Sequence, residues 1–526
     1  MQKLLNWLDQ NLLTILAGFL LVFLPLYPKW PLFDVLPGYN VRVRLEDFVI
    51  LMTGLFFIIQ VLRKKIDLKK APLLWPMVIY LIIGFLSTLS AIFITKTVYP
   101  EWIQIAKVFL HWFRRIEYFS LFFIFFYSLK TVKQLNRMLM LLGAAVMGVS
   151  IYGFGQKYLY WPAYSTMNRE FSKGIALYLT EHARVLSTFG GHFDLAAYIM
   201  MTLIPLILFS LLHPKKWVRW LTLSLSIVEY WLLILSASRI SWLAFMAGIT
   251  VAFAVLLKKQ PKQWVIGRWL VVVVLATLVM ISFGDLSERF SQIFKLQGVK
   301  DLVLRPFRSP PENAIPLAEN LTPEQQLAMV ATSTDVPPTP AVGAAPAPKP
   351  ADVYNEPYKN LADYLATTSG ETIHVDYSAN ALKYGLSVGI RLDTLWPNAI
   401  KALKINPLLG TGYSTLVKAN VWEFTIAEST DNDFLRMLGE TGLLGTLSFL
   451  AIFWVIFKTL WRAFLSASKP FTYALFAAGI GLTAGLLANA LYIDVFEASK
   501  IAYGYWSLIG LILALAVKTL AHEKTD

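Results

Sequence analysis

The chain has 526 residues, of which 56% are hydrophobic and 15% charged, with a formal net charge of +14 and no cysteine. A soluble globular domain carries about 25% charged residues, so this composition excludes an ordinary soluble protein and indicates a polytopic integral membrane protein. The lack of cysteine excludes disulfides, thiolate zinc sites and cysteine nucleophiles.

Apolar stretches of membrane-spanning length follow one another along most of the chain. At about 20 apolar residues per span, the sequence predicts an all-α fold with about twelve transmembrane helices. They are expected near residues 12–28, 46–62, 72–95, 113–129, 138–156, 193–212, 218–236, 240–257, 267–284, 433–457, 471–490 and 501–518. The first stretch has no small-residue cleavage site after it, so it is predicted to be a retained helix.

Lys and Arg concentrate in alternate connections between these stretches. The basic connections are 63–70, 129–137, 213–219, 258–268, 458–469 and the tail after Ala516. By the positive-inside rule they are expected on the cytoplasmic side, together with both termini. The positive net charge therefore reflects membrane topology, and no nucleic-acid partner is predicted.

One long polar segment interrupts the apolar pattern. It divides the chain into nine helices within 1–284, a large extracytoplasmic loop at 285–432, and three helices with a cytoplasmic tail at 433–526. A membrane protein with one large loop on one face is expected to build its site there.

The loop is not uniform in composition. Residues 332–350 are rich in Pro and Ala, which is typical of an extended linker. Helical spacing appears around it, and short helices are predicted at 322–330, 358–368 and 391–404. The sequence at 406–416 predicts a helix end followed by a glycine turn.

Arginines stand at several predicted outer helix ends. Arg239 lies in the turn between the seventh and eighth helices, Arg391 opens the amphipathic helix after the linker, and Arg184 precedes the sixth helix. A guanidinium can hold a phosphate or pyrophosphate with two parallel hydrogen bonds. The alternative is contact with lipid headgroups, which we favour for Arg114 and Arg115 at the start of the fourth helix. The tight turn around Arg239 favours a specific role there.

Asp431 ends the loop, and two interpretations of it remain open. Asp is a favoured helix N-cap, and Thr430 with Asp433 three residues later resembles a capping box. Alternatively, the Asp431 carboxylate is a general base or orients a hydroxyl at the membrane surface.

A polar stripe follows on the next helix. Asn432, Arg436 and Glu440 are spaced four residues apart and therefore share one helix face. We expect Arg436 and Glu440 to form a structural pair facing the bundle. Glycines at 439, 442, 445, 481 and 485 are expected to mark close helix packing.

The sequence gives little support for a metal site or a nucleotide-binding site. Glu428, Asp431 and Asp433 could supply oxygen ligands, but their spacing matches no dedicated metal loop, so no metal is predicted. His182 and His192 flank Arg184 and are expected to be solvated loop residues. No phosphate-binding glycine loop or dinucleotide fingerprint occurs, which argues against an ATP-driven pump, and no cofactor is predicted.

The order of these motifs resembles the O-antigen ligase and polymerase superfamily of bacterial membrane glycosyltransferases, over roughly residues 110–515. The matching pieces, in chain order, are the stretch 184–199, Ser238 with Arg239, Arg391 with Trp396, the turn 407–412, and the motif 430–445 with Asn432, Glu440, Gly442 and Gly445.

This resemblance implies a GT-C-like enzyme of the bacterial cytoplasmic membrane with its active site on the extracytoplasmic face. It would transfer a glycan from an undecaprenyl-pyrophosphate carrier to a glycan, lipid or protein acceptor, without a metal or a nucleotide sugar. Arg239 and Arg391 would hold the pyrophosphate, Arg184 would support them, and Asp431 would be catalytic. Asn432, Arg436 and Glu440 would support the site.

One position departs from part of that family. Ligases that use lipid A as acceptor carry His where this chain has Asp431, so a polymerase or a ligase with another acceptor fits at least as well. The alternatives are a protein O-oligosaccharyltransferase and a transporter of an anionic solute. A transporter is expected to place charges near the bilayer midplane on broken helices, whereas the arginines here are predicted at the outer edge.

Overall fold

The computed structural model describes residues 2–35, 42–167, 171–180, 183–282, 380, 386–416 and 429–523. The predicted linker at 332–350, the predicted helices at 322–330 and 358–368, and the candidate residues His182 and Glu428 lie outside this part of the chain.

The described residues are mainly helical. The elements are α1 (Gln2–Leu26), β1 (Pro31–Asp34), β2 (Arg42–Arg44), α2 (Leu45–Leu62), η1 (Leu68–Lys70), α3 (Leu74–Phe93), α4 (Trp102–Ser128), α5 (Val132–Tyr158), η2 (Phe171–Lys173), α6 (His192–Leu212), α7 (Lys216–Leu235), α8 (Arg239–Leu256), α9 (Lys262–Ser282), α15 (Leu386–Ile390), η4 (Arg391–Leu395), α16 (Trp396–Ile405), α17 (Asp433–Ser466), α18 (Pro470–Asn489) and α19 (Ser499–Glu523).

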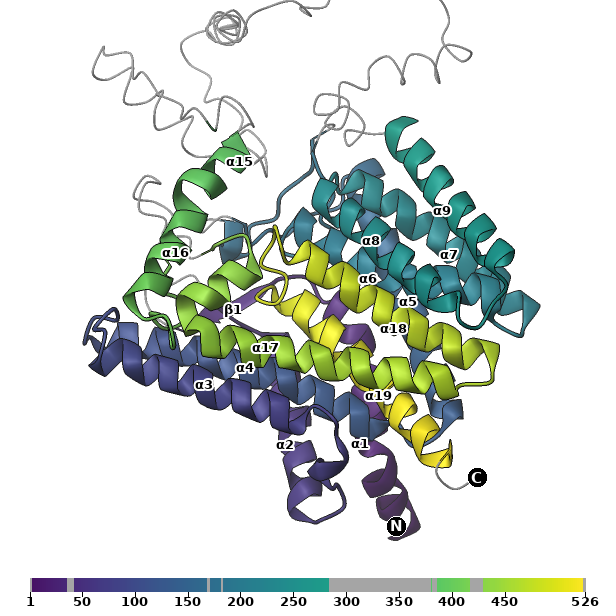
Figure 1. Cartoon of the computed structure of the whole chain (residues 1–526), viewed down its shortest axis with the longest axis horizontal. Helices are drawn as coiled ribbons and strands as arrows, with labels where there is room; N and C mark the ends of the chain where they lie inside the picture. The colour runs from purple at the N-terminus through teal and green to yellow at the C-terminus, as the bar shows by residue number, and fades with distance from the viewer. Residues whose placement is uncertain are drawn as a thin grey trace, which may run out of the picture.

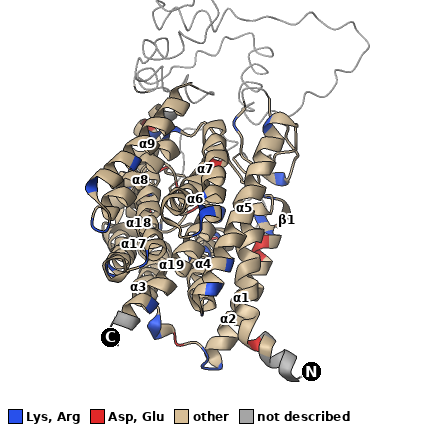
Figure 2. Ribbon diagram, turned by 90° about the vertical axis from the view of Figure 1, so that its right-hand side faces the viewer, with Lys and Arg blue, Asp and Glu red and all other residues tan. Residues whose placement is uncertain are grey.

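Eleven of the described helices are long and apolar enough to cross a membrane, which confirms an all-α polytopic architecture and indicates a multi-pass membrane protein. The remaining long helix, α4, is continuous, but its apolar sequence contains charged residues at 107, 114, 115 and 117. Most of the ribbon carries no charge of either sign (Figure 2).

Several helices extend beyond the predicted apolar stretches. α1 begins at Gln2 and not near residue 12, α4 begins at Trp102 and not near residue 113, and α17 runs to Ser466 and not to residue 457. The sequence pattern marks only the apolar part of each helix, while polar turns at a helix end continue the same hydrogen-bond ladder.

A small antiparallel hairpin lies between α1 and α2, which the all-helical prediction did not include. β1 pairs with β2 in a register that places Pro31 opposite Arg44 and Asp34 opposite Arg42. Just before the hairpin, Lys29 forms a buried ion pair of 2.9 Å with Glu46 of α2.

Close contact between α8 and α18 depends on small residues. A Cβ atom on Gly248 of α8 would lie 2.7 Å from the carbonyl oxygen of Gly481 and 3.1 Å from Cα of Gly485, so only glycine fits there. The prediction that Gly481 and Gly485 mark close packing is confirmed.

Several helix ends meet at one end of this bundle. The backbone N–H of Asp433, which begins α17, donates to the carbonyl of Ala490 after α18 (2.9 Å). Asn489 of α18 donates through Nδ2 to Ser241 Oγ in the first turn of α8 (3.1 Å). Both chain ends lie toward the bottom of Figures 1 and 2, on different sides of the bundle, whereas α15 lies at the top of Figure 1.

Candidate functional site

Asn432 is the N-cap of α17. Its Oδ1 accepts from the backbone N–H of Leu435 at 3.0 Å, and its Nδ2 donates to the carbonyl of Leu491 at 2.9 Å. The interpretation of Asp431 as the cap is therefore wrong. The capping box is absent as well, because Asp433 accepts from the backbone N–H of Phe496 (3.1 Å).

Asp431 instead pairs with Arg391. Arg391 Nη2 lies 2.9 Å from Asp431 Oδ2; the arginine side chain is 6% exposed and the aspartate side chain 29%. The guanidinium also lies over the ring of Tyr492, 4.0 Å from its centroid. Asp431 has a φ of 51°, an uncommon backbone conformation for a residue with a side chain. Two residues singled out independently in the sequence thus meet in space.

Arg391 lies inside a continuous helical segment and not at its start, where the sequence predicted it. It begins η4, one turn of π-helix that joins α15 to α16. A π-helical turn is rare and often occurs at functional sites, because it widens the helix and redirects its side chains.

Arg239 begins α8 at the same end of the bundle. Ser238 Oγ donates to Ser241 Oγ (3.0 Å), and Ser241 accepts from Asn489 at the end of α18. One turn further along, the backbone N–H of Tyr492 donates to the carbonyl of Asn489 (3.0 Å). The turn that carries Arg239 is therefore linked through Asn489 to the tyrosine that contacts Arg391.

Arg184 lies on the segment before α6. Its Nη1 is 2.7 Å from Nε2 of His192, the first residue of α6. The backbone N–H of Val185 donates to the carbonyl of Leu235 at the end of α7 (3.2 Å), so Arg184 lies beside the same turn that carries Arg239. His192 is only 2% exposed, and its predicted solvated role is wrong.

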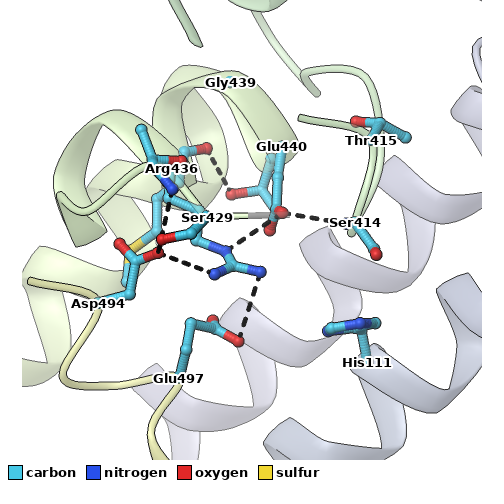
Figure 3. A network of polar contacts seen from close by, with 12 residues as sticks. His111, Ser414, Thr415, Ser429, Arg436, Gly439, Glu440, Asp494 and Glu497 are labelled. Atoms are coloured by element: carbon cyan, nitrogen blue, oxygen red, sulfur yellow. Dashed lines mark hydrogen bonds and ion pairs between the residues drawn. The ribbon is translucent and has the colours of Figure 1, made fainter. Parts of the chain in front are cut away.

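A buried network surrounds Arg436 (Figure 3). Its Nε lies 3.2 Å from Glu440 Oε1, which confirms the predicted pair. Its Nη1 lies 3.0 Å from Asp494 Oδ2, and its Nη2 lies 3.8 Å from Glu497 Oε2. Asp494 and Glu497, between α18 and α19, were not singled out in the sequence analysis. Two acids in a short connection between apolar helices are the signal that could have indicated them.

Asp494 also positions the segment that carries Asp431. It accepts from the backbone N–H of Asn432 at 2.8 Å and of Thr430 at 3.1 Å, and from Ser429 Oγ at 2.9 Å. Ser429 Oγ in turn lies 2.6 Å from Asp431 Oδ1. The orientation of Asp431 therefore depends on a buried carboxylate from another helix connection.

The prediction that Arg114 and Arg115 contact lipid headgroups is wrong. Both lie in the middle of α4: Arg115 pairs with Glu497, and Arg114 pairs with Asp47 at 2.9 Å and with Glu117 at 2.8 Å. Burial acts to raise the pKa of Glu497, but Arg115 and Arg436 outweigh it and hold that pKa below its usual value.

The glycine turn at 407–412 docks into a break in α17. Gly442 has a φ of 67° and interrupts the helix. The carbonyls of Gly439 and Glu440 accept from the N–H groups of Thr411 (2.9 Å) and Gly412 (2.8 Å). In exchange, the N–H groups of Leu443 (2.9 Å) and Leu444 (3.2 Å) donate to the carbonyls at 407 and 408. In an unbroken helix the N–H groups at 443 and 444 would donate to the carbonyls at 439 and 440. The four hydrogen bonds to the turn take the place of these two.

The described residues contain no group of three or more His, Asp or Glu side chains that could hold a metal ion. Asp431 and Asp433 are directed to different partners, Arg391 and the Phe496 N–H. A scan against models of known protein families finds no matching family, and a search of curated proteins finds no significant match.

Proposed function

We propose that the protein is a membrane glycosyltransferase that moves a glycan from an undecaprenyl-pyrophosphate carrier to an acceptor hydroxyl, on the extracytoplasmic face of the bacterial cytoplasmic membrane. The observation that carries the proposal is the 2.9 Å pair between Arg391 and Asp431, at the helix ends that also bear Arg239 and Arg184. A cationic group for a diphosphate and a carboxylate for a hydroxyl are the two functions that such a transfer needs.

In this reaction the acceptor oxygen forms a bond to the anomeric carbon. The bond from that carbon to the pyrophosphate oxygen breaks, and its electron pair leaves with the pyrophosphate. The acceptor proton passes to the carboxylate of Asp431. Arg391 and Arg239 stabilise the negative charge that builds on the leaving group, and Arg184 adds positive charge nearby.

The ion pair between Arg391 and Asp431 makes donor binding precede proton transfer. Without donor, Arg391 holds one carboxylate oxygen of Asp431 at 2.9 Å, so the guanidinium occupies that oxygen. An arriving pyrophosphate competes for the guanidinium, because phosphate oxygens are strong acceptors of its fork of N–H groups. Asp431 is then released from the ion pair, and its carboxylate can contact the acceptor hydroxyl when the donor is in place.

A second candidate is a transporter of an anionic solute, and one observation favours it. α17 breaks at Gly442 beside the buried charges of Arg436 and Glu440, and broken helices with buried charges are a feature of transporter sites.

The test uses the full chain in proteoliposomes with an undecaprenyl-pyrophosphate oligosaccharide, EDTA and an acceptor. We expect release of the lipid pyrophosphate. A lengthened glycan identifies a polymerase, and a glycosylated lipid or protein identifies a ligase. No release with any acceptor, together with solute flux into the vesicles, would replace the proposal with the transporter.

A further inference from the structure

A large cavity lies at the opposite end of the helices from Arg391 and Asp431. Its volume is about 1190 Å³, and it is lined by the end of α6, the start of α18, the end of α17 and the last turns of α19. α18 runs from this cavity at Pro470 to the site at Asn489. A helix of that length spans about 30 Å, which matches the hydrocarbon thickness of a bilayer.

The charges around this cavity have one sign. The described residues that line it include five cations, Lys130, Arg219, Arg268, Lys469 and Lys518, and no Asp or Glu. They come from five different connections or helix ends, so the fold gathers them although the sequence separates them.

Within the described part of the chain, the partners found for these cations are uncharged groups. Lys518 Nζ donates to the carbonyl of Leu129 (2.6 Å), and Arg219 Nε donates to the carbonyl of His213 (2.7 Å). Arg268 lies over the ring of Trp264, 4.3 Å from its centroid. Carbonyls and an indole ring orient these cations without neutralising them, so the cavity retains a positive potential.

The rest of the wall combines an apolar part with six hydroxyl or amide side chains, those of Thr131, Gln260, Ser466, Ser468, Thr472 and Thr519. Leu211, Leu212, Trp264, Phe471 and Leu515 line the cavity together with the cations. A free inorganic anion would gain nothing from these side chains, whereas an amphiphile would place its chains against them and its headgroup among the cations.

We propose that this cavity is a binding site for an anionic phospholipid, with the lipid phosphates held by the five cations and the acyl chains along the apolar part of the wall. The site is separate from the proposed transfer chemistry and does not depend on it. It lies at the other membrane face and uses none of the residues assigned to glycan transfer.

The test compares two triple variants of the full chain in uncharged detergent, titrated with cardiolipin and with phosphatidylcholine. The cavity variant carries Arg219→Gln, Arg268→Gln and Lys469→Gln. The matched control carries Lys258→Gln, Lys262→Gln and Lys458→Gln, which remove three exposed cations that do not line the cavity. Binding is followed by native mass spectrometry, and folding by the thermal unfolding midpoint without lipid.

We expect wild type and the control to bind cardiolipin in preference to phosphatidylcholine. We expect the cavity variant to lose at least about tenfold in cardiolipin affinity. Equal loss in both variants would mean a diffuse surface charge effect and would overturn the site. Displacement of cardiolipin by millimolar inorganic phosphate at unchanged ionic strength would overturn the lipid as ligand in favour of a free phosphate.

Discussion

Arg391 and Asp431 form an ion pair whose acidic member is the more exposed of the two. The guanidinium is enclosed by Tyr492 and by the protein around η4, while the carboxylate at 2.9 Å keeps a solvent-facing side. A purely structural pair gains little from such asymmetry. An open carboxylate beside a buried cation suits a site that must admit an anionic donor and a hydroxyl together.

Replacement of Arg391 tests whether Arg391 and Arg239 stabilise the pyrophosphate as proposed. We expect Arg391→Ala to lower the transfer rate by about 10²–10³-fold, the usual loss when one charge-stabilising donor is removed. Arg391→Lys should fall between this variant and wild type, because lysine keeps the charge but not the planar fork. Arg239→Ala should resemble Arg391→Ala. The control is Arg462→Ala at the far end of α17, and its rate should equal that of wild type. Wild-type transfer rates in both Arg391→Ala and Arg239→Ala would overturn the proposed role of these arginines at the pyrophosphate.

Asp431→Asn separates proton transfer from binding. The amide keeps the size of the side chain but cannot accept the acceptor proton, so kcat should fall by about 10²-fold or more. KM for the donor should remain within a few-fold of wild type, since Arg391 stays in place. A variant with normal kcat would assign Asp431 only to holding Arg391.

The cap of α17 can be tested by stability alone. Asn432→Ala removes the acceptor for the Leu435 N–H and should destabilise the protein by about 1 kcal/mol. Asn432→Ser keeps an acceptor oxygen for that N–H without adding a charge and should recover part of that stability. Thermal unfolding midpoints in detergent check the order, and equal midpoints for Asn432→Ala and Asn432→Ser would contradict the cap.

Gly442→Ala should disrupt the docking of the glycine turn. A Cβ atom at this position would lie 2.4 Å from the carbonyl carbon and oxygen of Leu408, and the φ of 67° is strained for alanine. The backbone angle alone costs about 1–3 kcal/mol, and the clash adds to it. Gly54→Ala on α2 is the matched control, since nothing lies within 4 Å of its added Cβ. Equal unfolding midpoints for the two variants would contradict the account.

The ion pairs of Glu497 are expected to make an acid-sensitive contribution to the stability of the fold. Its pKa in the folded protein lies below the usual 4.5, so its ion pairs stabilise the fold above that value and are lost as the pH falls through the lowered pKa. We expect the unfolding midpoint to decline below about pH 4.5, and Glu497→Gln to be less stable at pH 7 and to show a weaker decline. An unchanged pH dependence in the variant would show that other groups control acid unfolding.

The long helices and the Arg436–Glu440 pair could be predicted, because both follow from local periodicity along one helix. The partners of Arg436 on the α18–α19 connection could not, since Asp494 and Glu497 reach it only through tertiary packing. For the same reason Arg115 was assigned to lipid, although its partner is Glu497. The cap was misplaced by one residue because Asp and Asn are equally good caps in sequence. The φ of Asp431 and the hydrogen bonds of Asn432 distinguish them only in the structure.

The exchange of hydrogen bonds between α17 and the turn at 407–412 has a consequence for how the fold is completed. The first part of α17, up to Gly442, cannot satisfy its own backbone as an isolated segment in lipid, where each unpaired group costs several kcal/mol. The turn that completes it is made earlier in the chain and belongs to the long loop. The first part of α17 therefore reaches its final hydrogen-bonded form only together with the turn at 407–412, so the helix and the loop segment complete each other.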